Sequence, residues 1–456
     1  MKKLHWLPIV YLLLYPFAFS IAQPAVWNFQ KYDSVLAAQY YQYSADTTQQ
    51  LIQSYDKKVR DDYKKIYTHR LSQIKELLSA GHAVTDPQTV SYLQSIVERI
   101  IKSNDELKNL NLRILFSRDW WPNAFSMGEG TIIVNAGLFI YLKTEAELAF
   151  VLAHEIAHFK LNHSGRSVDR YIETIHSEAY QSELKRLAKE QYMVNRQLDQ
   201  LARTIVFNGR RHSREYETDA DQKAYYYLLK SGFYTGALES ALQTLNHIDD
   251  TVYFKPLHIE KLLNFTKYPF KQKWIQKESA IFSEMKEEIT QKEKMEEDSL
   301  KTHPDCLKRI ELFHKLNPEL KGDSFPINEP FFKQLQKNFL IEITEACYQN
   351  GNLSRNLYYS LQMIQENQFI PYAVYSAARC LNKIFEEQKN HSLGMQVDIE
   401  NKFFSEDYNL LLRFLNRIRL QELGLLNLHF CASYADLMKP YDGFQKEYSI
   451  AQQRTL

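Results

Sequence analysis

The chain has 456 residues, which is enough for two or three domains and a substantial core. Its 56 lysines and arginines nearly balance 55 aspartates and glutamates, so the charge argues against a nucleic-acid partner and gives no sign of an acidic substrate. An apolar content of 45% excludes wholesale disorder, and the small numbers of glycines (13) and prolines (13) favour a mainly helical chain.

The N-terminal residues predict an export signal. Two lysines precede an uncharged apolar run over Leu4–Ile21, which ends with small residues at Ser20 and Ala22. We therefore predict a signal peptide over residues 1–22, although an uncleaved membrane anchor is the alternative. No later stretch approaches 18 uncharged apolar residues. We expect an exported protein, periplasmic or associated with the cell envelope, that touches membranes only by association.

Helices are predicted next. Apolar and aromatic residues recur at three- and four-residue steps over Leu51–Leu78, which predicts one or two amphipathic helices in an N-terminal segment, residues 23–82. A polar cap and a proline at Thr85–Pro87 predict the start of another helix, Gln88–Ile101.

A β-rich stretch follows. Leu112–Phe116 and Thr131–Asn135 have the composition of strands, and Asn123–Ser126 leads into a glycine turn between them. Thr144 is then expected to cap a helix that carries the apolar run Leu148–Leu161.

The sequence HEIAH at His154–His158 has the form HExxH and lies within that apolar run. Because side chains at positions i and i+4 of a helix project from the same face, His154 and His158 are expected to converge and share a zinc ion. Glu155 is then expected beside the water-filled side of the metal. The alternative is a buried amphipathic helix that carries two histidines by chance, so the motif requires a third ligand.

The third ligand is expected on a separate helix. Glu217 and, one turn later, Asp221 lie on one face of a predicted helix that continues to Lys230. We predict that Glu217 binds the metal and that Asp221 accepts the free N–H of a ligand histidine. The alternative is that both are solvated charges on a helix surface.

His163 is the other nearby candidate for a metal ligand. The metzincin arrangement requires glycine and histidine where this chain has Leu161 and Ser164, so that family is excluded. His163 is expected at a helix end or on the surface.

The C-terminal half is predicted to be helical. Asp305–Leu316 predicts a helix, and a linker over Asn317–Pro330 precedes paired helices with a glycine turn. This order is typical of tetratricopeptide-like repeats, and a plain helical bundle is the alternative. The cysteines are expected as buried thiols or disulfides: Cys306, Cys347, Cys380 and Cys431.

Together these motifs resemble the M48 family of zinc metallopeptidases over residues 83–316. The resemblance rests on their order: NAF (Asn123–Phe125), a glycine turn, VNAGL (Val134–Leu138), HEIAH (His154–His158), SRxxExxAD (Ser213–Asp221) and THPxxxxRI (Thr302–Ile310). The chain is most similar to the periplasmic branch, in which a signal peptide and a C-terminal tetratricopeptide region flank the peptidase. Members of that branch assist or degrade outer-membrane proteins that fail to assemble.

The resemblance implies zinc ligands at His154, His158 and Glu217, a catalytic glutamate at Glu155 and an orienting aspartate at Asp221. It further implies that substrate docks as an added strand.

The expected docking edge is Thr131–Asn135. The resemblance also places His303 near the zinc, either as an added ligand that blocks the water site or as a substrate contact, with Arg309 nearby. A fourth protein ligand would close the site and make the enzyme latent. The alternative for His303 is a helix-capping role before proline.

We therefore expect an α+β, mainly helical protein. A zincin-type metallopeptidase domain with a small sheet is predicted over residues 83–320, and an all-α, helical-repeat-like region over 321–456. The expected function is an exported endopeptidase with one Zn²⁺ per chain that hydrolyses misfolded or unassembled envelope proteins, with Glu155 as general base toward zinc-activated water. The alternative is a chaperone or assembly factor that binds protein partners through its C-terminal helices and keeps a latent or vestigial zinc site.

Overall fold

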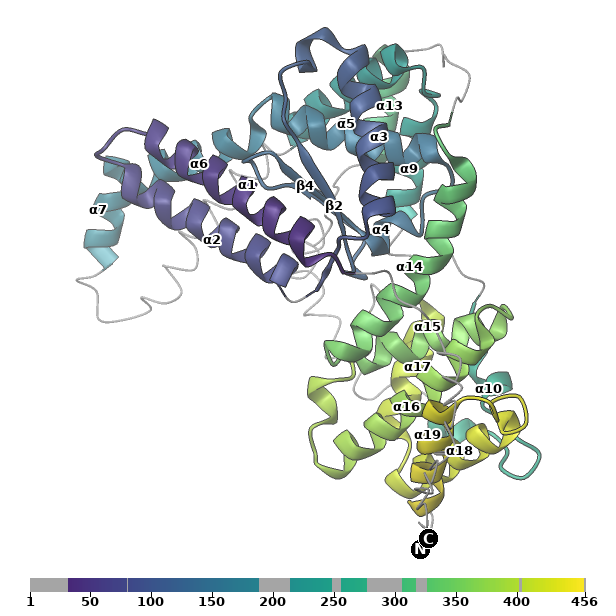
Figure 1. Ribbon diagram of the computed structural model, residues 1–456. Helices are drawn as coiled ribbons and strands as arrows, with labels where there is room; N and C mark the ends of the chain where they lie inside the picture. The colour runs from purple at the N-terminus through teal and green to yellow at the C-terminus, as the bar shows by residue number, and fades with distance from the viewer. Residues whose placement is uncertain are drawn as a thin grey trace, which may run out of the picture.

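The computed structural model describes residues 32–79, 81–187, 214–247, 256–276, 306–316, 326–401 and 404–454. As predicted, these residues are mainly helical, with one small sheet and an all-α C-terminal region (Figure 1). The predicted signal peptide lies outside the described residues. In the described part of the chain, no helix has the length and apolar character that a membrane crossing requires.

The N-terminal segment forms a hairpin of two helices, α1 (Ser34–Ser54) and α2 (Arg60–Ser79). Asp33 begins α1, because its carboxylate accepts the backbone N–H groups of the first turn. The two helices extend beside the sheet, together with α6 (His163–His176) and α7 (Glu178–Leu187) (Figure 1). Their inner faces pack on one face of the sheet through a cluster that includes Ala37, Tyr40, Ile74, Leu78, Leu115 and Ile133.

The sheet has four strands in the order β1-β2-β4-β3, with β1 at Ala83–Val84 and β2 at Arg113–Ser117. The predicted strand at Thr131–Asn135 is β4, which pairs in parallel with β2 and antiparallel with β3 (Ala124–Ser126). Since β4 is hydrogen-bonded on both sides, the expectation that substrate adds along Thr131–Asn135 is wrong. The outer strand beside β4 is β3.

Helices cover the other face of the sheet. α3 (Pro87–Ser103) begins as predicted, with the Asp86 carboxylate accepting the N–H of Thr89, and is followed by the short helix η1 (Asp105–Leu107). The short helix α4 (Ala136–Phe139) leads from β4 toward the metal-site helix.

That helix, α5 (Glu145–Lys160), carries the HExxH sequence. Thr144 caps it as predicted, because its side chain accepts the N–H of Glu147. Nearly all of α5 is buried, which explains why apolar residues occur on every side of the helix rather than along one stripe. A helix over residues 214–231, α9 (Ala237–His247) and α13 (Cys306–Leu316) complete this part of the molecule.

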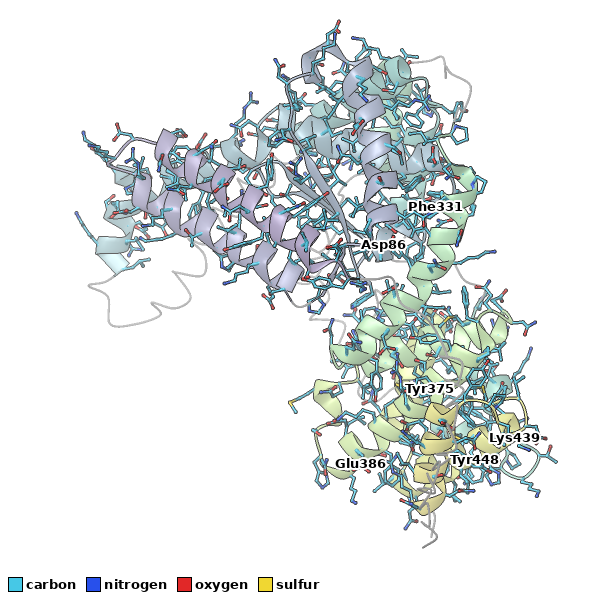
Figure 2. All side chains as sticks on the ribbon, in the orientation of Figure 1. Asp86, Phe331, Tyr375, Glu386, Lys439 and Tyr448 are labelled. Carbon is cyan, nitrogen blue, oxygen red and sulfur yellow. The ribbon has the colours of Figure 1, made fainter. Side chains whose placement is uncertain are left out.

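The C-terminal region contains α14 (Glu329–Gln349) and five further helices: α15 (Leu353–Gln365), α16 (Ile370–Lys389), α17 (Glu406–Arg417), α18 (Leu420–Tyr434) and α19 (Asp442–Gln453), with the short helix η5 (Leu393–Met395). Phe331, near the start of α14, lies in the upper part of the molecule, whereas Tyr375 and Tyr448 lie in the lower part (Figure 2). The six longer helices range from 12 to 21 residues. A regular repeat is therefore not evident, and tetratricopeptide-like character stays a prediction.

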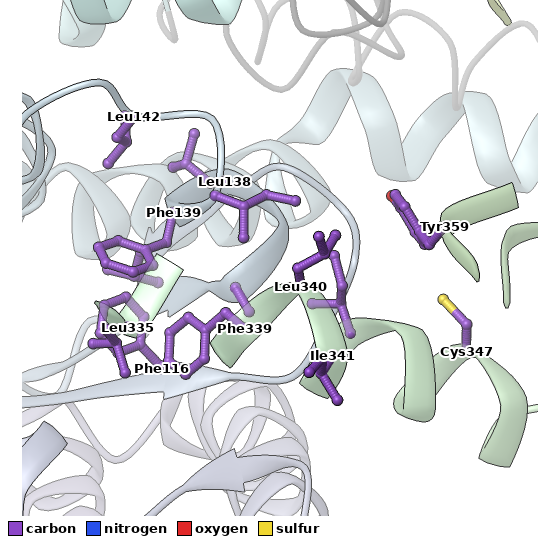
Figure 3. Packing of buried hydrophobic residues seen from close by; sticks show 14 of the residues in the cluster. Phe116, Leu138, Phe139, Leu142, Leu335, Phe339, Leu340, Ile341, Cys347 and Tyr359 are labelled. Carbon is purple, nitrogen blue, oxygen red and sulfur yellow. The ribbon is translucent and has the colours of Figure 1, made fainter. Parts of the chain in front are cut away.

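Helix α14 joins the two parts of the molecule. The Phe339 ring packs on Phe116 and Phe139, with ring centroids 4.8 and 5.3 Å away (Figure 3). Nearby, the Arg118 guanidinium lies 2.6 Å from the Glu342 carboxylate, and both side chains are largely buried. A single hydrophobic core therefore continues from the sheet into the C-terminal helices.

Residues 256–276, which include α10 (Ile259–Leu262) and η3 (Gln272–Trp274), lie against the C-terminal helices. The Trp274 indole N–H donates to Glu422 over 2.9 Å, and the Leu257 backbone N–H donates to Asp407 over 2.9 Å.

The predicted domain boundaries stay predictions. All four cysteines lie among the described residues, and each is a buried thiol.

Candidate metal centre

Two histidines project together from α5. The Nε2 atoms of His154 and His158 lie 3.0 Å apart, with ring centroids separated by 4.6 Å. This is the convergence that the i, i+4 spacing predicts. His154 is 4% exposed, so it is almost completely removed from water.

Glu217 approaches the same point from the helix over residues 214–231. One carboxylate oxygen lies 3.4 Å from His154 Nε2, and the other lies 3.3 Å from His158 Nε2. The donor atoms of the three residues all lie within 4.8 Å of one another. The structure thus brings together the three residues that the sequence analysis assigned as ligands.

Asp221 lies behind His154, one turn beyond Glu217. Its Oδ1 atom is 3.0 Å from His154 Nδ1, which leaves Nε2 of that ring directed toward the other two donors. Burial alone would raise the pKa of Asp221, but the Arg309 guanidinium and His154 outweigh it and hold the pKa below its usual range. The position matches the orienting role expected for this residue.

Arg309, on α13, binds both acidic residues. Its Nε and Nη2 atoms each donate to the Asp221 carboxylate over 2.6 Å, and Nη1 lies 2.9 Å from a Glu217 oxygen. Burial alone would lower the pKa of Arg309, but the two carboxylates outweigh it and raise the pKa above its usual value. Arg309 therefore holds the carboxylates from behind.

The other residue expected near the metal, His303, lies outside the described residues.

His163 has a place that the sequence analysis missed. It is the first residue of α6, so the expected helix end is correct, but its side chain is buried rather than on the surface. Its Nδ1 atom lies 2.9 Å from Nδ1 of His158, and its ring stacks on Tyr216 with centroids 4.1 Å apart. Burial and the adjacent His158 lower the pKa of His163 to about 4. A neutral His163 can accept the Nδ1–H of His158.

The sequence signal for this arrangement was the Asn162-His163 pair. Asn162 has a positive φ of 53°, a conformation that asparagine tolerates better than most residues and that ends helices. The chain therefore turns directly from α5 into α6. Gly165 fits this tight turn, because an added Cβ would lie 2.2 Å from the Asn162 side chain.

A pocket of about 310 Å³ opens on His158 and Glu217, two of the three clustered residues. Glu155, which is 5% exposed, lines it beside His158 and Glu217. The opposite wall comes from β3 and the residue before it, Asn123–Ser126. Arg309 does not line this pocket, which agrees with its place behind the carboxylates.

The charges of this cluster fit a divalent cation. The carboxylates of Glu217 and Asp221 share one guanidinium, that of Arg309, and the carboxylate of Glu155 lines the pocket beside Glu217, so acidic groups outnumber the one guanidinium. Burial lowers the pKa of His154, but hydrogen bonds with Asp221 and Glu217 outweigh it and raise the pKa to about 10. The site therefore attracts positive charge, and two imidazoles with one carboxylate are a donor set of catalytic zinc.

A helix with HExxH, a carboxylate from a second helix and an outer strand across the pocket define a metallopeptidase-type hydrolase. The model of peptidase family M48 matches residues 87–316. The chain belongs to peptidase family M48, a family of zinc metallopeptidases.

Shorter stretches are similar to individual proteins. The beta-barrel assembly-enhancing protease of Escherichia coli K12 is 28% identical over 96 residues, which is 21% of this chain and 20% of that protein. A Vibrio cholerae protein provisionally given the same name is 34% identical over 86 residues, 19% of this chain and 18% of its own. The Yersinia pestis protein of that name is 27% identical over 96 residues, 21% of this chain and 20% of its own. The chain thus spans about a fifth of the length of these relatives.

Proposed function

We propose that this protein is a zinc-dependent endopeptidase that hydrolyses peptide bonds of misfolded or unassembled envelope proteins. The observation that supports this most is the meeting of His154, His158 and Glu217 beside a pocket that His158, Glu217 and Glu155 line. A structural zinc site has no need of a glutamate at that place, because its four ligands close the metal to water.

Each residue of the proposed metal centre has its own role in the reaction. His154, His158 and Glu217 would hold one zinc ion, which when bound supplies a Lewis acid that activates water near neutral pH and polarises the scissile carbonyl. Glu155 accepts the proton of the attacking water and delivers it to the leaving amine. Asp221 keeps Nε2 of His154 directed toward the ion by accepting from Nδ1.

Substrate is proposed to add as a strand along β3. This strand pairs with β4 on one side and lies at the pocket that Glu155 lines. Backbone hydrogen bonds to a strand edge recognise any extended chain, so they favour unfolded segments over folded ones. This accounts for a protease that acts on misfolded proteins, because the backbone contacts do not depend on which side chains the substrate carries.

Two observations support the envelope as its place of action. The relatives that match parts of the chain are named as beta-barrel assembly-enhancing proteases. The first 22 residues have the composition of an export signal. We propose that the protein acts after export, in the periplasm or at the envelope.

The test compares wild type with Glu155→Gln, which keeps the size of the side chain and removes its basicity. Zinc content is measured on both purified chains, and cleavage of casein and of an unfolded outer-membrane protein is followed. We expect about one zinc ion per chain in both, and loss of cleavage by at least about 100-fold in the variant. Glu98→Gln, on the exposed side of α3, is the matched control and should cleave like wild type.

The same experiment decides between protease and chaperone. Equal zinc content with no cleavage by either chain would contradict the protease proposal. If wild type then suppresses aggregation of unfolded protein, the C-terminal helices become the functional part and the metal site is latent.

A further inference from the structure

A second and larger pocket lies between α2 and the sheet. Its volume is about 690 Å³, against about 310 Å³ for the pocket at the metal centre. One wall is the side of α2 that carries Gln73 and Leu77, and the floor includes Phe125 and Ile133 of the sheet. The C-terminal end of α14 closes one end at Ala346 and Asn350. The proposed reaction makes no use of this pocket.

The two pockets meet at β3. Asn123 and Phe125 line both of them. Side chains of a strand alternate between the two faces of a sheet. Ala124 belongs to the core on the α5 side, whereas Phe125 packs on the cluster beneath α1 and α2. The α2 pocket therefore lies on the face of the sheet to which Phe125 points, whereas the metal-site pocket borders all four residues Asn123–Ser126 along the outer strand.

Among the described residues, β3 pairs with a strand only on its β4 side, so an extended chain can pair with its other side. The side chains of the added strand also alternate between the two faces. If one residue of the added strand faces Glu155, the next residue along it faces α2. The larger pocket is thus placed to receive one side chain from the α2 face of an extended segment that is bound for cleavage.

The parts of the lining that come from α2 and the sheet include large apolar side chains. These are Ile74, Leu77, Phe125, Met127 and Ile133. The pocket has more than the volume of an aromatic ring, and polar and charged groups, among them Glu76, Arg118 and Asp119, also line it. Burial of an aromatic side chain in such a place is worth a tenfold or greater difference in binding over alanine.

We propose that the pocket between α2 and β3 is a specificity subsite, which takes a large apolar or aromatic side chain of an extended polypeptide one residue away from a side chain on the Glu155 face. The proposal rests on the proposed function, since the occupant is the substrate of that site. It selects extended chains that carry a bulky apolar residue at this one position.

The experiment uses the full-length protein with zinc and a set of ten-residue peptides. Each peptide contains one phenylalanine, which is moved through the positions of an otherwise serine- and threonine-rich sequence, and kcat/KM is compared with the alanine version. Gln73→Trp places a bulky side chain from an exposed position of α2 into the pocket. Ser72→Trp, one residue earlier and also exposed, does not line the pocket and is the matched control.

For wild type and Ser72→Trp we expect kcat/KM to be at least about tenfold higher with phenylalanine at one particular position. In Gln73→Trp this preference should fall to about twofold or less, with unchanged zinc content and thermal unfolding. Cleavage without a positional preference, or a preference that Gln73→Trp leaves intact, would overturn the subsite.

A binding measurement separates this proposal from the proposed activity. The same peptides are titrated into Glu155→Gln, alone and combined with Gln73→Trp, with fluorescence anisotropy as readout. Tighter binding of one phenylalanine peptide, lost on adding Gln73→Trp, supports the subsite even if wild type cleaves nothing. Equal binding of all peptides overturns it even if wild type is an active protease.

Discussion

The Nδ1 atom of His163 lies 2.9 Å from the Nδ1 atom of His158, and the His163 ring stacks on Tyr216, the residue before Glu217. The buried His163 imidazole thus contacts His158, a proposed metal ligand on α5. It also contacts Tyr216, which precedes the proposed ligand Glu217 on a different helix. His154 has a carboxylate behind it, that of Asp221, whereas His158 has this neutral ring. The two ligand histidines are therefore held by groups of different charge.

His163→Phe removes the ring nitrogens and keeps an aromatic ring against Tyr216. The Nδ1–H of His158 then has no acceptor at His163, so the ring is less well oriented. We expect zinc affinity to fall about 10- to 100-fold. Competition with a chromophoric chelator measures the zinc affinity. His176→Phe, at the exposed end of the same helix, is the control and should bind zinc like wild type. Equal affinities for all three chains would show that His163 only fills space.

Arg309→Met should destabilise the fold. The change leaves the buried carboxylates of Asp221 and Glu217 without their common cation. We expect the free energy of unfolding of the zinc-free protein to fall by about 3–5 kcal/mol in urea. Added zinc should restore part of the lost free energy of unfolding, because it supplies positive charge beside Glu217. Arg186→Met, which breaks an exposed pair with Glu183, should leave the unfolding free energy nearly unchanged. A loss no larger than that of the control would contradict a structural role for Arg309.

The contact of Glu422 with residues 271–274 should depend on pH. Burial alone would raise the pKa of Glu422, but hydrogen bonds from Lys273, Trp274 and Lys271 outweigh it and lower the pKa from 4.5 to about 2. Because the folded-state pKa is the lower one, the contribution to stability is complete above about pH 4.5 and is lost as the pH falls toward 2. The cost of Glu422→Gln in urea unfolding should therefore be smaller at pH 3 than at pH 6. An equal cost at both values would show that the carboxylate charge does not matter.

Phe339→Ala should weaken the connection between the two parts of the molecule. The Phe339 ring is fully buried between Phe116 and Phe139, so its removal leaves a cavity in the shared core. We expect a loss of about 3–5 kcal/mol in the free energy of unfolding, measured by denaturant titration. Leu437→Ala, at a position that is 53% exposed, serves as the control and should change little. Separate unfolding transitions in the variant would show that α14 couples the two parts.

Much of the local structure followed from the sequence. Helix caps were predicted within Thr85–Pro87 and at Thr144, and Asp86 and Thr144 cap these helices, because a capping side chain acts on backbone groups two or three residues away. The strand at Thr131–Asn135 was predicted at its observed bounds. Here the contacts that decide the conformation lie within a few residues of the side chain concerned.

The edge strand was harder to predict. β3 has only three residues, Ala124–Ser126, too few to show the alternation that identifies a strand. Its pairing with β4 depends on the turn between them, and this pairing decides which strand is left at the edge. The predicted docking edge was wrong for that reason.

The sequence by itself determined that His154 and His158 share a helix face, since their spacing matches one turn, and the order of motifs pointed to Glu217 as their partner. Only the tertiary structure decided that His163 lies behind His158, that Arg309 holds two carboxylates, and that β3 borders two pockets. The physical reason is distance along the chain. Arg309 is 88 residues from Asp221, and residues as far apart as Gln73 and Asn350 line the α2 pocket, so no local pattern brings them together. His163 is five residues from His158, but its ring also stacks on Tyr216 of another helix.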